Sequence, residues 1–461
     1  MSKFETDLTQ GSVVKQLIRF SLPFLLSNFI QALYSVADLY IVSLFCPTGS
    51  MVGVNIGGQL ALLITNLAVG LSLGGTIVIA QYAGAQKQED MKQTISTMLS
   101  VLTFAAAVLT VGAIAASTPL LRLLNTPETS LVEARRYFNI CMLGNIFVFG
   151  YNAISGILRS VGDSKRPLYF VAFSASVNVG LDLLLVMVFG MGAAGAALAT
   201  IASQAMAMIL AIVYLNRSKF MFSFSLGNLR IHKDKLGKIL KMGLPASVQS
   251  VVISISFLII TAMTNTFGEN AAAGVAAIGK INTFVILPAM AISQSVSPMT
   301  AQNIGAGRYD RAMKTMWAGV GISGVVCVIM FFIFQAFAPQ FVGIFANDPL
   351  TRDEVIRFGS EYARAMTWDY LFIPFVFNMT NFAGGAGHSM ASLKANMLSA
   401  IILRVPVAWL FGIHLGMGLS GLGFGIPAST IGTIIYIGSY IARGKCKEGK
   451  LGISRDAQSA D

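Results

Sequence analysis

The chain has 461 residues, of which 55% are hydrophobic and only 11% are charged, and its mean hydropathy is +0.71. A soluble domain carries about 25% charged residues, so this composition excludes an ordinary soluble protein and favours a polytopic membrane protein. The net charge of +12 does not indicate a nucleic-acid partner, because the basic residues lie in short loops beside apolar segments.

Apolar segments of the length that crosses a bilayer as a helix, about 20 residues, recur along the whole chain. They predict an all-α polytopic membrane protein with twelve transmembrane helices. The predicted spans are 16–45, 52–81, 93–117, 134–158, 167–190, 192–215, 239–266, 273–302, 313–337, 357–384, 393–413 and 417–442.

The loops between these spans differ in charge. When alternate loops are assigned to opposite sides, most of the 32 Lys and Arg residues fall on the side that also holds both termini. Positive loops stay in the cytoplasm. The sequence therefore predicts a multi-pass protein of the cell (cytoplasmic) membrane with both termini in the cytoplasm.

Three short motifs occur twice, in the same order and at a nearly constant offset. The motif pairs are QLIRFSLP (16–23) with KILKMGLP (238–245), AQYAGAQ (80–86) with AQNIGAG (301–307), and FGMGAAGAA (189–197) with LGMGLSGLG (415–423). Six spans in each half predict a parallel repeat, which is a common transporter plan.

The repeat predicts two pseudo-symmetric six-helix lobes around a central cleft, an arrangement suited to alternating access. The predicted parts are an N-terminal lobe (1–215), a cytoplasmic linker (216–238), a C-terminal lobe (239–442) and a cytoplasmic tail (443–461). We expect the protein to be a monomer.

Of the acidic residues, only Asp38 and Asp182 lie well inside a predicted span. Helical rise places Asp38 about 10 Å below the outer surface. The turn centred on Met191 places Asp182 and Thr200 at a common level, about 13 Å deep. Asn178 precedes Asp182 by one turn and lies on the same face of the helix.

Carboxylate, amide and hydroxyl oxygens suit Na⁺ or a transferable proton, so these four residues form a candidate cation-coupling site. The structural alternative is a set of hydrogen bonds that only join helices. The repeat places Ile260, Arg404, Ala408 and Ile426 at the corresponding positions of the second half. Because the polar cluster is absent there, we interpret the site as functional rather than architectural.

Gln31 and Tyr34 share a helix face with Asp38, and they are candidates, with Asn152, for lining the cleft; ordinary interhelical packing is the alternative.

Arg404 and Lys280 lie inside spans, where we favour structural pairing over an anionic substrate. The four cysteines show no metal or redox spacing and are predicted to be structural. No nucleotide-binding or catalytic motif is present, which indicates neither an enzyme nor a bound cofactor.

These residues resemble the multidrug and toxic compound extrusion (MATE) family, over about residues 10–445. The motifs that carry the resemblance are LPFLLSNFIQALYSVADLYIV, AQYAGAQ, LRSVGDSKRP, VNVGLDLLLV, GMGAAGAALAT, AQNIGAG and LRVPVAWLFG. The resemblance implies twelve helices in two lobes forming a V-shaped cleft, and export of amphipathic organic cations in exchange for H⁺ or Na⁺.

The polar cluster is similar to that of the prokaryotic branch with DNA-damage-inducible and archaeal members. That likeness implies a cation site at Asp38, Asn178, Asp182 and Thr200, a helix bend at Pro23, and cleft roles for Gln31, Tyr34 and Asn152. Two features depart from the family pattern. Leu183 replaces a frequent proline, and the acids of a second-lobe site are missing, with Asp369 too early in its helix.

The sequence thus predicts a secondary multidrug antiporter that is coupled to H⁺ or Na⁺ and acts on small organic cations in a lipid membrane. One alternative is a flippase for lipid-linked oligosaccharides with the same broad fold, although few buried basic residues are available to hold a diphosphate. The other is a membrane receptor or scaffold without transport, which the repeat and the short loops disfavour.

Overall fold

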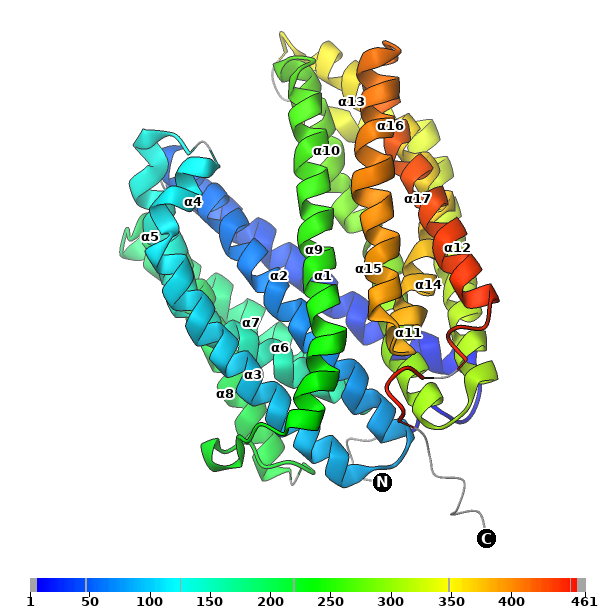
Figure 1. Ribbon diagram of the computed structural model, residues 1–461. Helices are drawn as coiled ribbons and strands as arrows, with labels where there is room; N and C mark the ends of the chain where they lie inside the picture. Colours follow the sequence, from blue (N-terminus) through cyan, green and yellow to red (C-terminus); the bar gives the residue numbers. More distant parts are fainter. Residues whose placement is uncertain are drawn as a thin grey trace. The chain divides into compact units, whose positions relative to one another are not determined.

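The computed structural model describes residues 6–45, 48–124, 126–218, 220–346, 349–447 and 449–453, and it is built from helices and their connections, with no strand in these ranges (Figure 1). Helices satisfy every backbone hydrogen bond within one segment, as a bilayer requires. Large apolar side chains such as Phe104, Val111 and Ile435 are more than two-thirds exposed. An exposed apolar surface of this extent is suited to contact with lipid.

Nine described helices are long and apolar enough to cross a membrane, and the number rises to eleven when two bent helix pairs are each taken as one span. The bent pairs correspond to the predicted spans 134–158 and 273–302. The remaining predicted span, 357–384, is divided into two shorter helices by a 3₁₀ turn. Each of the twelve predicted spans therefore has a helical counterpart, as the predicted all-α architecture requires.

The chain folds into two compact units. The first unit comprises Met1–Asp7 and Leu26–Ser247, and the second comprises Leu8–Leu25 and Val248–Asp461. The division falls inside two long helices, α1 (Val13–Phe45) and α9 (Lys233–Asn265). Each of these helices begins in one unit and ends in the other, whereas the prediction places the span 16–45 wholly in the N-terminal lobe and the span 239–266 wholly in the C-terminal lobe.

Glycines on α2 let neighbouring helices of the first unit approach closely. A Cβ at Gly57 would lie 2.8 Å from the Ala134 carbonyl oxygen, and a Cβ at Gly74 would lie 2.5 Å from the Gly243 nitrogen. Small residues support such close packing in membrane proteins. The complete helices of this unit are α2 (Thr48–Gly84), α3 (Gln88–Ala115), α4 (Ser117–Leu123), α5 (Glu128–Leu143), α6 (Asn145–Ser160), α7 (Lys165–Asp182), the π-helix η1 (Leu183–Val188), α8 (Gly192–Arg217) and the 3₁₀ turn η2 (Leu226–Asn228).

In the second unit, the start of α1 contributes Leu17, Phe20 and Phe24 to an apolar core with Val296 and Phe382. The complete helices of this unit are α10 (Glu269–Val285), α11 (Leu287–Gly305), α12 (Tyr309–Gly343), α13 (Arg352–Met366), η3 (Thr367–Leu371), α14 (Ile373–Gly385), α15 (Ser389–Met397), η4 (Leu398–Arg404), α16 (Val405–Trp409), η5 (Leu410–His414) and α17 (Gly418–Ala442).

The internal repeat is visible in the backbone. Gly190 and Gly192 have φ values of 64° and 57°, and their counterparts Gly416 and Gly418 have 67° and 62°. Glycine adopts this left-handed region without the steric penalty of a Cβ. A π-helix precedes the turn in both halves, with Phe189 N–H donating to the Leu184 carbonyl (3.0 Å) and Leu415 N–H donating to the Leu410 carbonyl (2.8 Å). The two helical hairpins therefore have the same local structure.

Candidate functional site

Helix α7 carries two of the predicted cation ligands. Its start is fixed by Asp163, whose Oδ1 accepts the backbone N–H groups of Lys165 (3.1 Å) and Arg166 (3.2 Å) and whose carboxylate pairs with the Arg166 side chain. Asp182, at the other end, is fully buried, and Asn178 is 1% exposed. These two residues are one turn apart, so their side chains share a face, about 6 Å from each other along the axis.

Asp38 lies on the part of α1 that belongs to the first unit. The next turn of this helix buries Ile41 and Val42 in an apolar core with Val186 and Ala197. Side chains three and four residues apart share a helix face, so Asp38 is directed to the same side as that core. Its half-buried carboxyl group has one oxygen, Oδ1, that is inaccessible and has no hydrogen-bond partner among the described residues.

The structure brings the two predicted acids together. The carboxyl groups of Asp38 and Asp182 lie within electrostatic range of each other. Both oxygens of Asp182 and both polar side-chain atoms of Asn178 lack a hydrogen-bond partner in the part of the chain that the structure describes. An unsatisfied buried polar group is destabilising by about 1–3 kcal/mol. A proton or a small cation between the carboxylates would remove this penalty.

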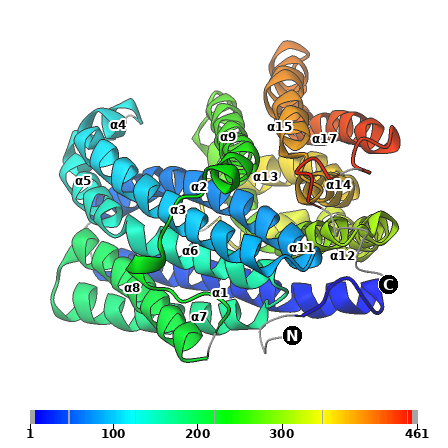
Figure 2. The ribbon, with the colours of Figure 1, turned by 60° about the horizontal axis from the view of Figure 1, so that its bottom comes forward.

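Thr200 lies on α8, which packs beside α7 (Figure 2). Its half-buried hydroxyl donates to the Ala196 carbonyl of the same helix at 3.0 Å. This bond uses the hydroxyl hydrogen and leaves an oxygen lone pair available for a cation. The described contacts do not join Thr200 to either carboxyl group, so its role as a ligand remains a prediction.

The predicted cleft residues differ in their links to the acids. The Tyr34 hydroxyl interacts with the Gln204 side chain, and its ring lies within electrostatic range of Asp38. Asn152, on α6, donates to the Val148 carbonyl of its own helix at 2.8 Å. Gln31 is half-buried, and its side chain has no hydrogen bond with the described residues. The structure therefore connects only Tyr34 to the acid pair.

Two residues were not predicted: Tyr137, which lies near the acids, and Gln204, which interacts with Tyr34. Tyr137, on α5, is 7% exposed and interacts electrostatically with both Asp38 and Asp182. Gln204 follows Thr200 by one helical turn, so the i, i+4 spacing used for Asn178 and Asp182 could have identified it. Tyr137 carries no comparable signal, because it lies in a different helix and is brought to the site only by packing.

The second unit supplies an internal comparison. Ile260, Ala408 and Ile426, the repeat counterparts of Asp38, Asp182 and Thr200, are all buried in one apolar core. All three of these positions of the second unit therefore carry apolar side chains inside the core. The second unit needs no polar group at these positions, which supports the view that the acids of the first unit are not required by the fold.

Arg404 occupies the position that corresponds to Asn178. Its guanidinium lies 4.6 Å from the centre of the Phe257 ring, and its Nε donates to the Ser429 hydroxyl at 3.4 Å. Asp369 interacts with it electrostatically. Lys280 is exposed and lies 5.7 Å from the Phe345 ring centre. Arg404 thus has partners within its own unit, whereas Lys280 makes no ion pair with the described residues. Structural pairing of the two cations stays a prediction.

The described ranges contain few other groups that could bind a metal or react. They contain no group of three or more His, Cys, Asp or Glu residues that could hold a metal ion. Cys141, Cys327 and Cys446 are free thiols, and Cys46 lies outside the described residues. Burial raises the pKa of the Cys446 thiol to about 12, so this thiol remains protonated and inert at neutral pH.

Apolar helices of spanning length and an internal repeat define a multi-pass membrane protein. The family model described as MatE matches residues 23–184 and 245–410. The chain belongs to this family, the MATE transporters.

Curated relatives match nearly the full chain. "Probable multidrug resistance protein YpnP" of Bacillus subtilis (strain 168) is 31% identical over 445 residues, which cover 96% of this chain and 98% of that protein. "Probable multidrug resistance protein YoeA" of the same organism is 26% identical over 439 residues, with 94% of each chain covered. These matches show the family, and the branch within it stays a prediction.

Solved structures share the fold. The structure described as "Outward-facing conformation of a multidrug resistance MATE family transporter of the MOP superfamily" has a TM-score of 0.88 and 22% identity, covering 97% of this chain and 99% of that one. A MATE structure "in the bent conformation" has a TM-score of 0.86 and 23% identity, covering 96% and 97%. At this identity, the likeness concerns the fold alone.

Proposed function

We propose that this chain is a secondary multidrug antiporter of the cell membrane, with both termini in the cytoplasm, which exports amphipathic organic cations in exchange for H⁺ or Na⁺. The observation that carries the proposal is the proximity of Asp38 and Asp182, two carboxyl groups in the first unit with unsatisfied buried oxygens. The names of the curated relatives support multidrug efflux.

The coupling follows from charge. Two carboxylates in a low dielectric repel each other, so the pair binds H⁺ or Na⁺, with Asn178 and Thr200 supplying further oxygen atoms. Binding of the ion changes the charge of the first unit and thereby the affinity for a cationic cargo. Ion and cargo then compete, and each can drive the release of the other. No bound cofactor is required.

Transport into proteoliposomes tests this coupling. Ethidium movement is measured under an imposed pH gradient and, separately, under an imposed Na⁺ gradient. We expect one gradient to drive transport by the parent protein, and we expect Asp182→Asn to abolish the driven component. The control is Asp353→Asn, which removes an exposed carboxylate at the start of α13. Unchanged driven transport in both Asp38→Asn and Asp182→Asn would overturn the proposal.

The flippase alternative receives less support from the side chains. A lipid diphosphate requires several buried cations, but Lys280 is exposed and Asp369 lies within electrostatic range of Arg404. A flippase assay with lipid-linked sugar separates the two functions. Translocation of that lipid, without ethidium transport, would favour the alternative.

A further inference from the structure

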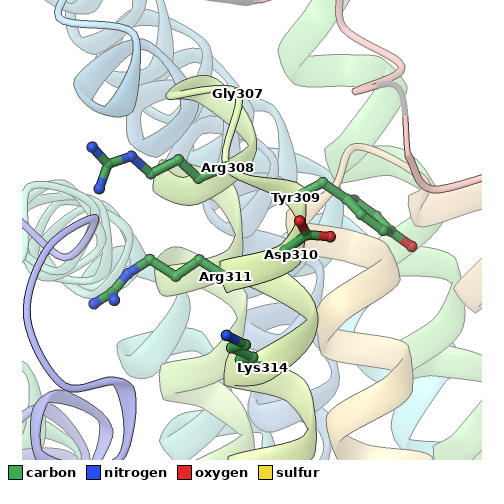
Figure 3. Close-up of a pocket in the computed structure, with 6 residues that line it drawn as sticks. All are labelled: Gly307, Arg308, Tyr309, Asp310, Arg311 and Lys314. Carbon is green, nitrogen blue, oxygen red and sulfur yellow. The ribbon is translucent and has the colours of Figure 1, made fainter.

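A basic pocket lies where α12 begins, in the second unit. The pocket has a volume of about 490 Å³ and is lined by Gly307, Arg308, Tyr309, Asp310, Arg311 and Lys314 (Figure 3). Three of these side chains are cationic and one is anionic. Arg308 and Arg311 extend to the same side of the helix, and Tyr309 extends to the opposite side (Figure 3), where its ring packs on Phe382 with centroids 6.2 Å apart.

The cations of the pocket differ in how they are engaged. Arg311 donates to the backbone carbonyls of Gln10 (2.6 Å) and Gly11 (2.6 Å) and to the Gln16 side chain (2.8 Å). Arg308 uses Nη1 to donate to the Thr9 carbonyl at 2.7 Å. Lys314 is exposed and has no hydrogen bond or ion pair with the described residues. Arg308 and Lys314 therefore supply positive charge and N–H donors at the pocket.

The surface beyond the pocket is apolar and lies along one face of α12. Lys314 is followed at helical spacing by Trp317, Gly321, Val325 and Val328. Trp317 is 50% exposed, Val325 is 63% exposed and Val328 is 40% exposed, and the space around Gly321 is open. Tryptophan favours the boundary between lipid headgroups and acyl chains. Positive charge, a half-exposed tryptophan and an apolar surface thus follow one another along α12. This order matches the headgroup, the interface and the acyl chain of an anionic phospholipid.

We propose that this face of α12 is a binding site for an anionic phospholipid. The phosphate lies between Arg308 and Lys314, and an acyl chain lies along Trp317, Gly321 and Val325. Basic pockets beside membrane helices recognise anionic headgroups in this way. The continuous apolar face below the pocket favours a lipid over a free phosphate ion. The proposal does not depend on which ion or cargo the transporter moves.

Fluorescence of Trp317 reports occupancy of the site. The chain has three tryptophans, so Trp368→Phe with Trp409→Phe leaves Trp317 alone. The full chain is placed in nanodiscs that contain a small fraction of brominated phosphatidylglycerol or brominated phosphatidylcholine. We expect stronger quenching by the brominated phosphatidylglycerol. Each basic residue near a surface contributes about fivefold in affinity for anionic lipid, so Lys314→Gln should weaken the preference about fivefold.

Lys314→Glu should abolish the preference. The matched control is Lys241→Glu, which reverses the charge of an exposed lysine on α9, and it should leave the preference unchanged. Equal quenching by the two lipids in the parent, an unaffected Lys314→Glu variant, or an equal loss in Lys241→Glu would overturn the proposal. Release of the quenching by soluble glycerol phosphate would identify a soluble-anion site and would also overturn it.

Discussion

At the scale of single residues, the central feature is a pair of buried polar side chains whose atoms lack hydrogen-bond partners. Asp182 and Asn178 are buried, and their side-chain oxygen and nitrogen atoms lack partners in the described ranges. A side chain retained for stability would be hydrogen-bonded. Functional sites commonly sacrifice stability in this way, so we interpret Asp182 as retained for ion binding.

This interpretation predicts that asparagine affects stability differently at two equivalent positions of the repeat. Asp182→Asn removes a buried charge that lacks a donor, so the variant should unfold at no lower a temperature than the parent. Ala408→Asn places an unsatisfied amide in an apolar core and should be destabilising by about 1–3 kcal/mol. Thermal unfolding in detergent measures both. A large loss of stability in Asp182→Asn would show that the acid has a structural role instead.

The sequence predicted the acid pair because depth along a helix follows directly from residue count. Asp38 and Asp182 lie within electrostatic range of each other, and the depth of each span and the hairpin at Met191 are what led us to expect them near one level. Tyr137 was not predicted, because its contact with the acids depends on how α5 packs, and residue spacing within one helix does not encode that packing.

At the scale of elements, the hairpin that follows Asp182 depends on its backbone conformation. The π-helix η1 begins at Leu183, directly after the acid, and the turn at Gly190 closes the hairpin. Because the second half has the same π-helix and turn without an acid, these features belong to the repeat. Leu183 stands where the family often has proline. The helix at this position is a π-helix, which is locally wider than a regular α-helix. The residue spacing did not predict it.

The turn can be tested by adding a single methyl group. Gly190 has a φ of +64° and open space around it, so Gly190→Ala introduces backbone strain of about 1–2 kcal/mol without a clash. Gly112 also has open space around it but lies within the regular helix α3, and Gly112→Ala should be neutral or stabilising by up to about 1 kcal/mol. Denaturation midpoints compare the two variants. Equal midpoints would contradict the assigned role of the turn.

At the scale of the whole chain, each unit holds the beginning of the first helix of the other half. In the second unit, Arg311 binds the backbone of residues 8–11 and the Gln16 side chain (2.8 Å). In the first unit, Asp90 pairs with Lys235 near the start of α9. Arg311 and Asp90 occupy equivalent positions after the AQNIGAG and AQYAGAQ motifs. Equivalent residues of opposite charge therefore contact the chain near the start of α1 in the second unit and near the start of α9 in the first unit.

Removal of Arg311 should release the N-terminal segment. Arg311→Ala deletes several charge-assisted hydrogen bonds to residues 8–16, so amide hydrogen exchange in that segment should increase by at least tenfold, corresponding to about 1.4 kcal/mol of local stability. Lys314→Ala, one turn later, removes a cation without such bonds and should leave exchange unchanged. Equal exchange in Arg311→Ala and the parent would contradict the assigned anchoring role.

Residue spacing predicted the number and type of the membrane helices, and the repeat was confirmed by the matching turns. The exchange of helix beginnings between units was not predicted, because the apolar pattern of α1 is continuous through Leu25 and Leu26. That pattern specifies a helix but not the partners of its two ends. Arg311 in RYDRAMK also resembles an ordinary topology-determining cation until its contacts are known.

The most direct test of the account is whether cargo expels the coupling ion from the acid pair. Purified protein in weakly buffered detergent, loaded in parallel with ²²Na⁺, is titrated with ethidium while released H⁺ and ²²Na⁺ are measured. The account predicts release of one of these ions in proportion to bound ethidium, and no release from the Asp38→Asn, Asp182→Asn double variant. Ethidium binding without release of either ion, or undiminished release from the double variant, would contradict it.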